Sequence, residues 1–357
     1  MAVQPAEAST RPVGRRASET ALHRPSGRRR RTLQFFASGM LLLLICAASL
    51  IIGARAIGPS TLVDVLLSYN PGNGDHAVVL SRIPRTVTGL LAGAALGVAG
   101  AAIQGMARNP LGDPGILGLN AGASLAVVVA IYLFGVSTAS GYIWFAFAGA
   151  AFAALVVYGV ASLGREGATP VKLALAGAAL AAGLGSLTTS VLVSSQETLD
   201  RFRFWQVGTL SGRGWDVILT VLPFIVGGLV LTMAMGKALN SLVLGDDVAR
   251  GLGQHVGRTR GFAAVGIVVL CGAATAAAGP IAFVGLVIPH MVRLVSGPDY
   301  RWILPFSALL GPVLLITADI LGRVILPPAE VQVGIMTALV GAPVFIWLVR
   351  RRRMAQL

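Results

Sequence analysis

Eight stretches of 17 or more residues in this 357-residue chain contain no aspartate, glutamate, lysine or arginine. They are residues 32–54, 86–107, 114–164, 173–196, 217–236, 261–292, 302–318 and 331–349. A helix that crosses the hydrocarbon core of a bilayer needs about 20 mostly apolar residues, so most of these stretches match one spanning helix each. The chain is 55% hydrophobic and 12% charged, which excludes a disordered chain, a coiled coil and a disulfide-rich secreted scaffold. The sequence predicts an all-α polytopic membrane protein.

Two of these stretches are too long for one helix. A polar turn at 135–141 divides the stretch 114–164 into two spans. Gly279-Pro280 interrupts the stretch 261–292, which is compatible with two short spans or with one span and a re-entrant piece. Both termini are rich in arginine and are expected in the cytoplasm, which requires an even number of spans. The ten predicted transmembrane helices are residues 33–53, 85–107, 115–135, 142–163, 172–195, 216–236, 261–278, 281–293, 302–322 and 330–349, within a permease domain of residues 33–353.

The net charge of +14 is concentrated at the two ends of the chain. Residues 1–32 contain eight arginines and two glutamates, and residues 350–353 are four consecutive arginines. Basic clusters that flank apolar stretches are typical of cytoplasmic anchoring, so no nucleic-acid partner is expected. Residues 1–32 contain few large apolar groups and are predicted to form a disordered, arginine-rich cytoplasmic tail.

Small residues recur at every fourth position in the second predicted span. They are Gly89, Gly93, Gly97, Ala101 and Gly105. This spacing places them on one helix face, where another backbone can approach closely, so the helix is expected in the centre of the bundle.

Motifs for covalent chemistry and nucleotide binding are absent from the sequence. Gly236-Lys237 does not continue as a phosphate-binding loop, and the isolated histidines and two cysteines form no metal-ligand pattern. Asp113 and Asp319 fall at predicted span ends, whereas ion-coupled carriers usually bury ionisable groups in the bilayer. We therefore expect a transport protein without catalytic residues, cofactor or metal, driven by a separate ATPase. An ion-coupled secondary carrier is the alternative from another class.

Six segments carry a family resemblance over about residues 35–353. The most specific are RIPRTVTGLLAGAALGVAGAAIQGMARNPLGDPGILGLNAGAS (82–124) and GPIAFVGLVIPHMVR (279–293). The others are WQVGTLSGRGW (205–215), LNSLVLGDDVARGLG (239–253), ADILGR (318–323) and GIMTALVGAPVFIWLVRR (334–351). On these segments the chain resembles the FecCD-type permeases of ATP-binding-cassette importers, which take up iron–siderophore complexes, haem and cobalamin.

The resemblance implies a fold of ten spans in the bacterial plasma membrane with both termini in the cytoplasm. It also implies the partners: a second permease subunit, identical or paralogous, two ATPases that bind ATP and magnesium, and an extracytoplasmic siderophore-binding protein. We expect the cargo to be a ferric siderophore, with haem or cobalamin as the alternative.

The loop 236–260 is the expected docking site for the ATPase. Leu242, Leu244, Val248 and Leu252 recur at near-helical spacing, Asp246 and Asp247 favour a helix N-terminus, and Gly251 and Gly253 can end a helix. The resemblance implies two short coupling helices here, which include Arg250. An interfacial helix lying on lipid is the alternative.

Two further sets of residues are expected at functional surfaces. The resemblance implies that Arg82, Arg85 and Arg323, on the outside, receive glutamates of the binding protein; anchoring at lipid phosphates is the alternative. Small polar residues of the fifth span are expected to line the pathway, namely Ser186, Thr188, Thr189, Ser190, Ser194 and Ser195.

Overall fold

The computed structural model describes residues 27–55, 57–163 and 169–354, and the regular secondary structure of these ranges is helical. The helices are α1 (Gly27–Ile51), α2 (Pro59–Leu67), α3 (Gly74–Met106), η1 (Pro114–Leu117), α4 (Leu119–Phe134), α5 (Ala139–Ala161), α6 (Pro170–Ser194), α7 (Gln196–Gln206), α8 (Trp215–Ala234), α9 (Gly236–Val243), α10 (Asp246–Gly251), α11 (Val256–Ala278), α12 (Val284–Ser296), α13 (Tyr300–Ile325) and α14 (Val333–Met354).

Ten of these helices coincide with the ten predicted spans. In the described ranges, seven are long and apolar enough to cross a membrane: α1, α3, α5, α6, α8, α11 and α13. The other three, α4, α12 and α14, contain shorter apolar stretches. The stretch 261–292 is divided into two helices, because Gly279 (φ 78°) ends α11 and Phe283 (φ 70°) precedes α12. Whether the 13-residue α12 spans the membrane stays a prediction.

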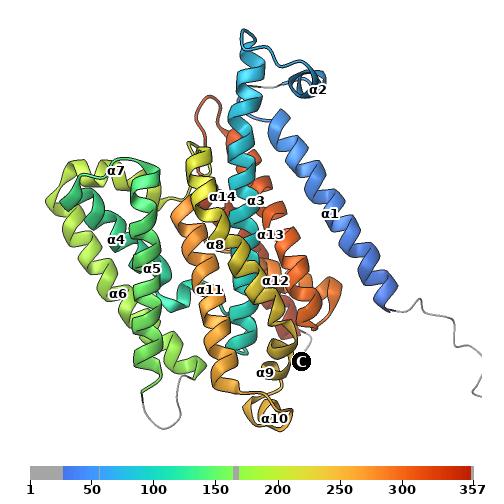
Figure 1. Cartoon of the computed structure of the whole chain (residues 1–357), viewed down its shortest axis with the longest axis vertical. Helices are drawn as coiled ribbons and strands as arrows, with labels where there is room; N and C mark the ends of the chain where they lie inside the picture. Colours follow the sequence, from blue (N-terminus) through green and yellow to red (C-terminus); the bar gives the residue numbers. More distant parts are fainter. Residues whose placement is uncertain (1–26, 56, 164–168, 355–357) are drawn as a thin grey trace, which may run out of the picture.

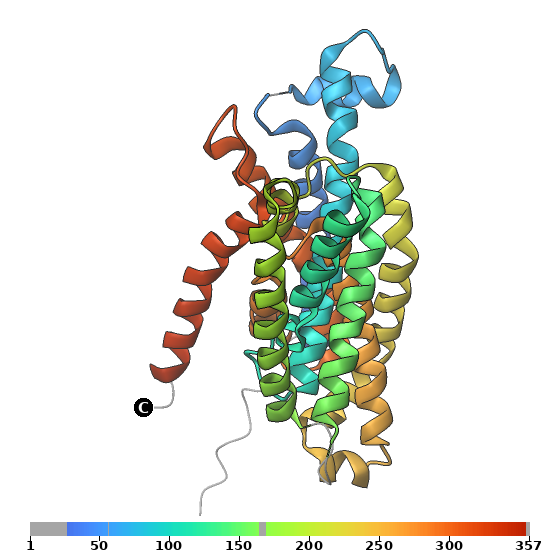
Figure 2. The same ribbon diagram turned by 90° about the vertical axis from the view of Figure 1, so that its left-hand side faces the viewer.

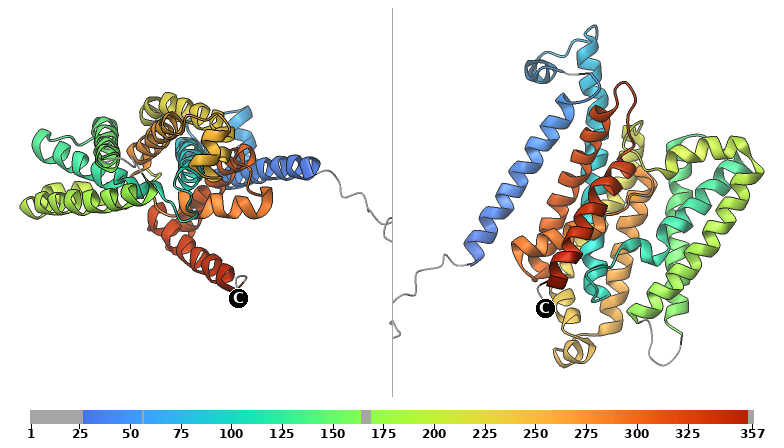
Figure 3. Two further views of the ribbon diagram at one scale, coloured as in Figure 1. Left: turned by 90° about the horizontal axis from the view of Figure 1, so that it is seen from below. Right: turned by 180° about the vertical axis from the view of Figure 1, so that it is seen from behind.

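Helix α3 is the central element of the bundle, and 83% of its most apolar 18-residue stretch is buried. It packs against α8, α11, α12 and α13, while α4, α5, α6 and α7 form a group at one side (Figure 1). Figure 2 shows α14 diverging from the other helices, and Figure 3 shows α1 and α14 on different sides of the bundle. The start of α1 and the end of α14 lie at the same end as α10, as an even number of spans requires.

The stripe of small residues lies on the α3 face that packs against other helices, as predicted. A Cβ atom at Gly93 would be 2.5 Å from the Pro312 Cα, and one at Gly97 would be 2.5 Å from the Ser307 carbonyl oxygen. Ala101 is fully buried, and Gly89 and Gly105 face side chains of α13. The glycines therefore let the α3 and α13 backbones approach closely.

Helices α1 and α3 begin well before the predicted spans. Helix α3 begins eleven residues before the predicted span, at Gly74, because the Asn73 side chain accepts a hydrogen bond from the Asp75 amide and caps the helix. Helix α1 begins at Gly27, so residues 27–32 are helical and do not belong to a disordered tail. The rest of the predicted tail, residues 1–26, lies outside the described residues.

Candidate functional site

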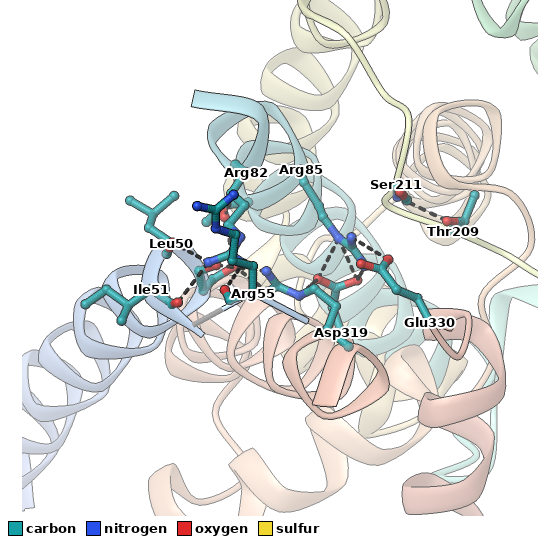
Figure 4. A network of polar contacts seen from close by, with 12 residues as sticks. Leu50, Ile51, Arg55, Arg82, Arg85, Thr209, Ser211, Asp319 and Glu330 are labelled. Atoms are coloured by element: carbon teal, nitrogen blue, oxygen red, sulfur yellow. Dashed lines mark hydrogen bonds and ion pairs between the residues drawn. The ribbon is translucent and has the colours of Figure 1, made fainter. Parts of the chain in front are cut away.

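A network of polar contacts, which includes Arg82, Arg85, Asp319 and Glu330, lies at the end of the bundle that carries α2, which we call the α2 end (Figure 4). The opposite end, with α9 and α10, is called the α10 end. The outer arginine network consists of Arg82 and Arg85 on α3, Asp319 and Arg323 on α13, and Glu330 in the loop before α14.

Arg82 caps the end of α1. Its Nη1 donates to the carbonyl oxygens of Leu50 (2.9 Å) and Ile51 (2.8 Å), and its Nη2 donates to that of Arg55 (2.7 Å). The last carbonyls of a helix have no partner within the helix, and this guanidinium supplies one. Arg82 is consequently only 7% exposed.

Arg85 makes a forked contact with two acids. Its Nε and Nη2 donate to the Asp319 carboxylate at 2.9 and 2.8 Å, and its Nη1 donates to Glu330 Oε2 at 2.7 Å. The Arg85 side chain keeps 13% of its surface exposed and that of Glu330 keeps 35%, whereas Asp319 keeps 3%. The Arg85–Glu330 pair is therefore the part of the network that a molecule outside the protein can reach.

Arg323 is buried in the bundle, at 1% exposure. Its Nη1 and Nη2 donate to the Ser49 carbonyl oxygen and the Ser49 hydroxyl, both at 2.9 Å. Its Nε lies 3.3 Å from the Asp319 carboxylate. Arg323 thus connects α13 to α1 and shares the charge of Asp319 with Arg85.

Two of the three arginines expected to receive glutamates of the binding protein, Arg82 and Arg323, are buried. Both are used inside the protein, because the end of α1 leaves carbonyl groups that need donors and Asp319 needs a countercharge. Burial in protein also separates both guanidinium groups from lipid phosphates. Of the three, Arg85 alone has the geometry of a surface contact, so docking at this residue stays a prediction.

At the α10 end, the loop 236–260 contains two short helices, as the resemblance implied. Helix α9 packs its apolar side inward, and Leu242 is 1% exposed, so its predicted place on a docking face is wrong. Leu244, Val248 and Leu252 are 63%, 49% and 61% exposed. These three form the exposed apolar face of the loop, which we call the α10 face.

Asp246 holds the loop to the ends of two long helices. Its carboxylate accepts from Arg108 Nη2 after α3 (3.0 Å) and from Arg260 Nη2 on α11 (2.9 Å). Asp247, by contrast, is exposed and pairs with Arg250 within α10. Gly245 (φ 112°) and Gly253 (φ 79°) make the turns on either side of α10, whereas Gly251 is its last helical residue.

A second anchor joins α9 to the start of α13. Asp299 Oδ1 accepts from Asn240 Nδ2 at 2.7 Å, and the Tyr300 amide donates to Asn240 Oδ1 at 2.8 Å. The Arg301 guanidinium and the Asn240 amide hold the pKa of Asp299 at about 2, below its ordinary value. The two anchors tie the loop to α3, α11 and α13.

Helix α6 presents small polar side chains on an open face. Ser186, Thr189, Ser190 and Ser194 are exposed, and each hydroxyl donates to a carbonyl of its own helix at 2.7–3.0 Å. The hydrogens of these hydroxyl groups are therefore already used within the helix and are not available to a solute. Thr188 and Ser195 do not belong to this face: the former is buried, and the latter caps α7.

Several residues of these sites were missed from the sequence. Glu330, Asn240 and Asp299 bond to groups far away in the chain, so no local pattern indicates them. Glu330 is the only acid between Asp319 and the C-terminus, which is the one signal that could have marked it. Among the described residues, no group of three His, Cys, Asp or Glu side chains is placed to hold a metal ion.

Comparison with known proteins identifies the family to which this chain belongs. The model of the FecCD transport family matches residues 41–351, which includes the outer arginine network, the α10 face and the open face of α6. The chain belongs to the FecCD transport family. The ferric enterobactin transport system permease protein FepD of Escherichia coli (strain K12) is 48% identical over 318 residues, covering 88% of this chain and 94% of that protein.

Two further comparisons agree with this family. The cobalamin import system permease protein BtuC of Halobacterium salinarum is 41% identical over 282 residues, covering 77% of this chain and 74% of that protein. A solved structure of a metal-chelate type ABC transporter in an inward-facing conformation superposes with a TM-score of 0.79 at 27% identity, covering 90% of this chain and 99% of that chain. The chain is therefore a multi-pass permease of the FecCD family.

Proposed function

We propose that this chain is the membrane permease subunit of an ATP-binding-cassette importer that takes up a ferric siderophore. The observation that carries this proposal is the 48% identity to a ferric enterobactin permease over nearly the whole length of both proteins. The α10 end faces the cytoplasm, and both termini lie there. The chain performs no covalent chemistry of its own, and ATP is hydrolysed by partner subunits.

The pathway runs along the open face of α6. Only 17% of the most apolar 18-residue stretch of α6 is buried against the rest of the protein. A Cβ atom at Gly183 on this helix would meet nothing within 4 Å. A second permease subunit, identical or paralogous, closes the pathway on this side. Because the hydroxyl hydrogens of this face are already donated within α6, the face offers the chelate few hydrogen-bond donors, so the pathway binds it weakly and leaves its selection to the binding protein.

The ATPases act through the α10 face. ATP binding draws two ATPase subunits together, and the apolar side chains of the α10 face seat α10 on one of them. The anchors at Asp246 and Asp299 then carry the motion into α3, α11 and α13, which lie against the centre of the bundle. The two permease subunits rock about their shared seam, so that the pathway opens alternately to the two sides.

The extracytoplasmic binding protein docks at Arg85. A glutamate of the binding protein would replace Glu330, whose contact with Arg85 is the exposed member of the network. Asp319 stays bound to Arg85 and Arg323 during this exchange, because it is buried and paired on both sides.

A cobalamin cargo is the second candidate function, favoured by the 41% identity to a cobalamin permease. Ion coupling is disfavoured, because the buried Asp319 is already neutralised by Arg85 and Arg323. The proposed energy source is tested by uptake in whole cells treated with vanadate or with an uncoupler. We expect vanadate to abolish uptake and the uncoupler to leave the initial rate unchanged; the opposite pattern would show an ion-coupled carrier.

A further inference from the structure

A polar pocket lies at the α10 end, between the end of α5 and the start of α11. Its volume is about 620 Å³. Small-molecule sites are typically about 300–1,000 Å³. Its walls are Tyr158, Ser162, Asp246, Arg250 and the segment 254–260 except Thr259. Asp246 and Arg260, which form an anchor of the coupling loop, stand in one wall, but the space itself has no role in the function proposed above.

Three arginines and one aspartate line the pocket, which makes it basic. Arg260 is held in place by Asp246, at 2.9 Å. Arg250 is exposed and paired with Asp247 outside the pocket. Arg258 is exposed and has no ion pair with any residue that the structure describes. The start of α11, a 23-residue helix, lies in the same wall and adds the partial positive charge of a helix N-terminus.

Exposed apolar side chains continue from this pocket along α5 and α11, away from the α10 end. On α11, Phe262 and Val265 follow Arg258 on one helix face and are 56% and 52% exposed. On α5, Leu155 precedes Tyr158 and Ser162 on one face and is 73% exposed. The two helices therefore present a basic pocket at the α10 end and exposed apolar side chains next to it.

We propose that this pocket binds the phosphate headgroup of an anionic phospholipid, with an acyl chain lying along Leu155, Phe262 and Val265. A phosphodiester carries the negative charge that Arg258 and Arg260 can pair with, and guanidinium groups donate to phosphate oxygens in forked geometry. Tyr158 and Ser162 add hydroxyl groups at the rim. Basic pockets between transmembrane helices at the cytoplasmic side are suited to anionic headgroups. The apolar surface distinguishes this ligand from a free phosphate, which would use the pocket alone.

The binding is tested by native mass spectrometry of the purified chain with phosphatidylglycerol and phosphatidylcholine. We expect the wild type to retain phosphatidylglycerol, and Arg258→Glu to weaken this binding about tenfold, as expected for reversal of one surface charge. Arg203→Glu is the matched control: Arg203 is an exposed arginine of α7 at the other end of the bundle. Equal loss in both variants, or equal binding of the two lipids to the wild type, would overturn the proposal.

A second variant separates a lipid from a soluble phosphate. Phe262→Ser removes apolar surface at an exposed position, so the fold should survive. It should weaken phosphatidylglycerol binding while leaving competition by glycerol phosphate unchanged. If glycerol phosphate binds the wild type as tightly as the lipid, and Phe262→Ser has no effect, the pocket takes a soluble phosphate and the lipid assignment is wrong. If assembly with the ATPase expels the lipid, the pocket belongs to that interface instead.

Discussion

Arg323 on α13 donates from Nη1 to the backbone carbonyl of Ser49 on α1 at 2.9 Å, across 274 positions of the chain. The same guanidinium binds the Ser49 hydroxyl and lies beside Asp319. The Ser49 hydroxyl also forms a hydrogen bond with the hydroxyl of Thr86 on α3, at 2.9 Å. The end of α1 is thus fastened to the bundle by polar contacts, although the helix itself stands apart from most of it (Figure 1).

Replacing Arg323 with glutamate should destabilise the protein strongly. The change leaves the Ser49 carbonyl without its donor and places a second carboxylate next to Asp319. Breaking a buried ion pair in this way costs about 3–5 kcal/mol. Thermal unfolding in detergent measures the effect, with Arg55→Glu as the control because the Arg55 side chain is 63% exposed. Equal melting temperatures for Arg323→Glu and the wild type would contradict the structural role.

The charges of Arg85 and its partner Glu330 should govern the rate at which the binding protein associates. Glu330→Gln removes the internal competitor, so association should become faster at low salt, whereas Arg85→Glu should slow it. A charge at the rim of an interface changes the association rate more than the dissociation rate. Surface-plasmon measurements on permease in nanodiscs at several salt concentrations distinguish these effects. Unchanged association in both variants would remove Arg85 from the docking surface.

Adding a methyl group at Gly93 should weaken the packing of α3 against α13. The new Cβ would be 2.5 Å from the Pro312 Cα, which is backbone and cannot turn away. Overpacking of this kind costs about 1–3 kcal/mol. Gly183→Ala is the matched control, since a Cβ there meets nothing within 4 Å on α6. The melting temperature should fall for Gly93→Ala only.

A charge at Leu252, or proline in place of Gly251, should uncouple transport from ATP hydrolysis without unfolding the permease. Leu252 is 61% exposed on the α10 face, and a charge is costly in an apolar groove of the ATPase. The same change at Leu67, an 80% exposed residue of α2, is the control. Co-purification of the ATPase and its stimulation are the readouts. Normal association and transport in Leu252→Glu would show that α10 does not contact the ATPase.

The Asp299 anchor should be insensitive to pH in the physiological range. The folded pKa of Asp299, about 2, lies below the ordinary value of about 3.9, so its contribution to stability is complete above about pH 4. That contribution is lost as the pH falls from about 4 through about 2. Thermal unfolding between pH 3 and pH 7 should show a steeper acid loss for the wild type than for Asp299→Asn. Parallel curves would contradict the depressed pKa.

The apolar stretches predicted the positions of ten helices, because the bilayer dictates the length and composition of a spanning helix. The glycine stripe was also predicted, since close packing needs small residues at a fixed spacing. The burial of Arg82 and Arg323 was not predicted. An arginine at a helix end can face water or cap another helix, and the tertiary arrangement decides between the two. Helices α2 and α7 have nine and eleven residues, too few for a span, so a search for spanning stretches passes over them. The burial of Leu242 depends on how α9 packs, which spacing alone does not reveal.

Uptake of labelled iron by a strain that lacks this permease tests the central claim most directly. Cells would receive a ferric catecholate siderophore, a ferric hydroxamate siderophore or labelled cobalamin, each with and without the restored gene. We expect uptake of at least one ferric siderophore to be lost in the deletion strain and restored by the gene, while cobalamin uptake stays constant. Unchanged uptake of both ferric siderophores together with loss of cobalamin uptake would show that the cargo is cobalamin.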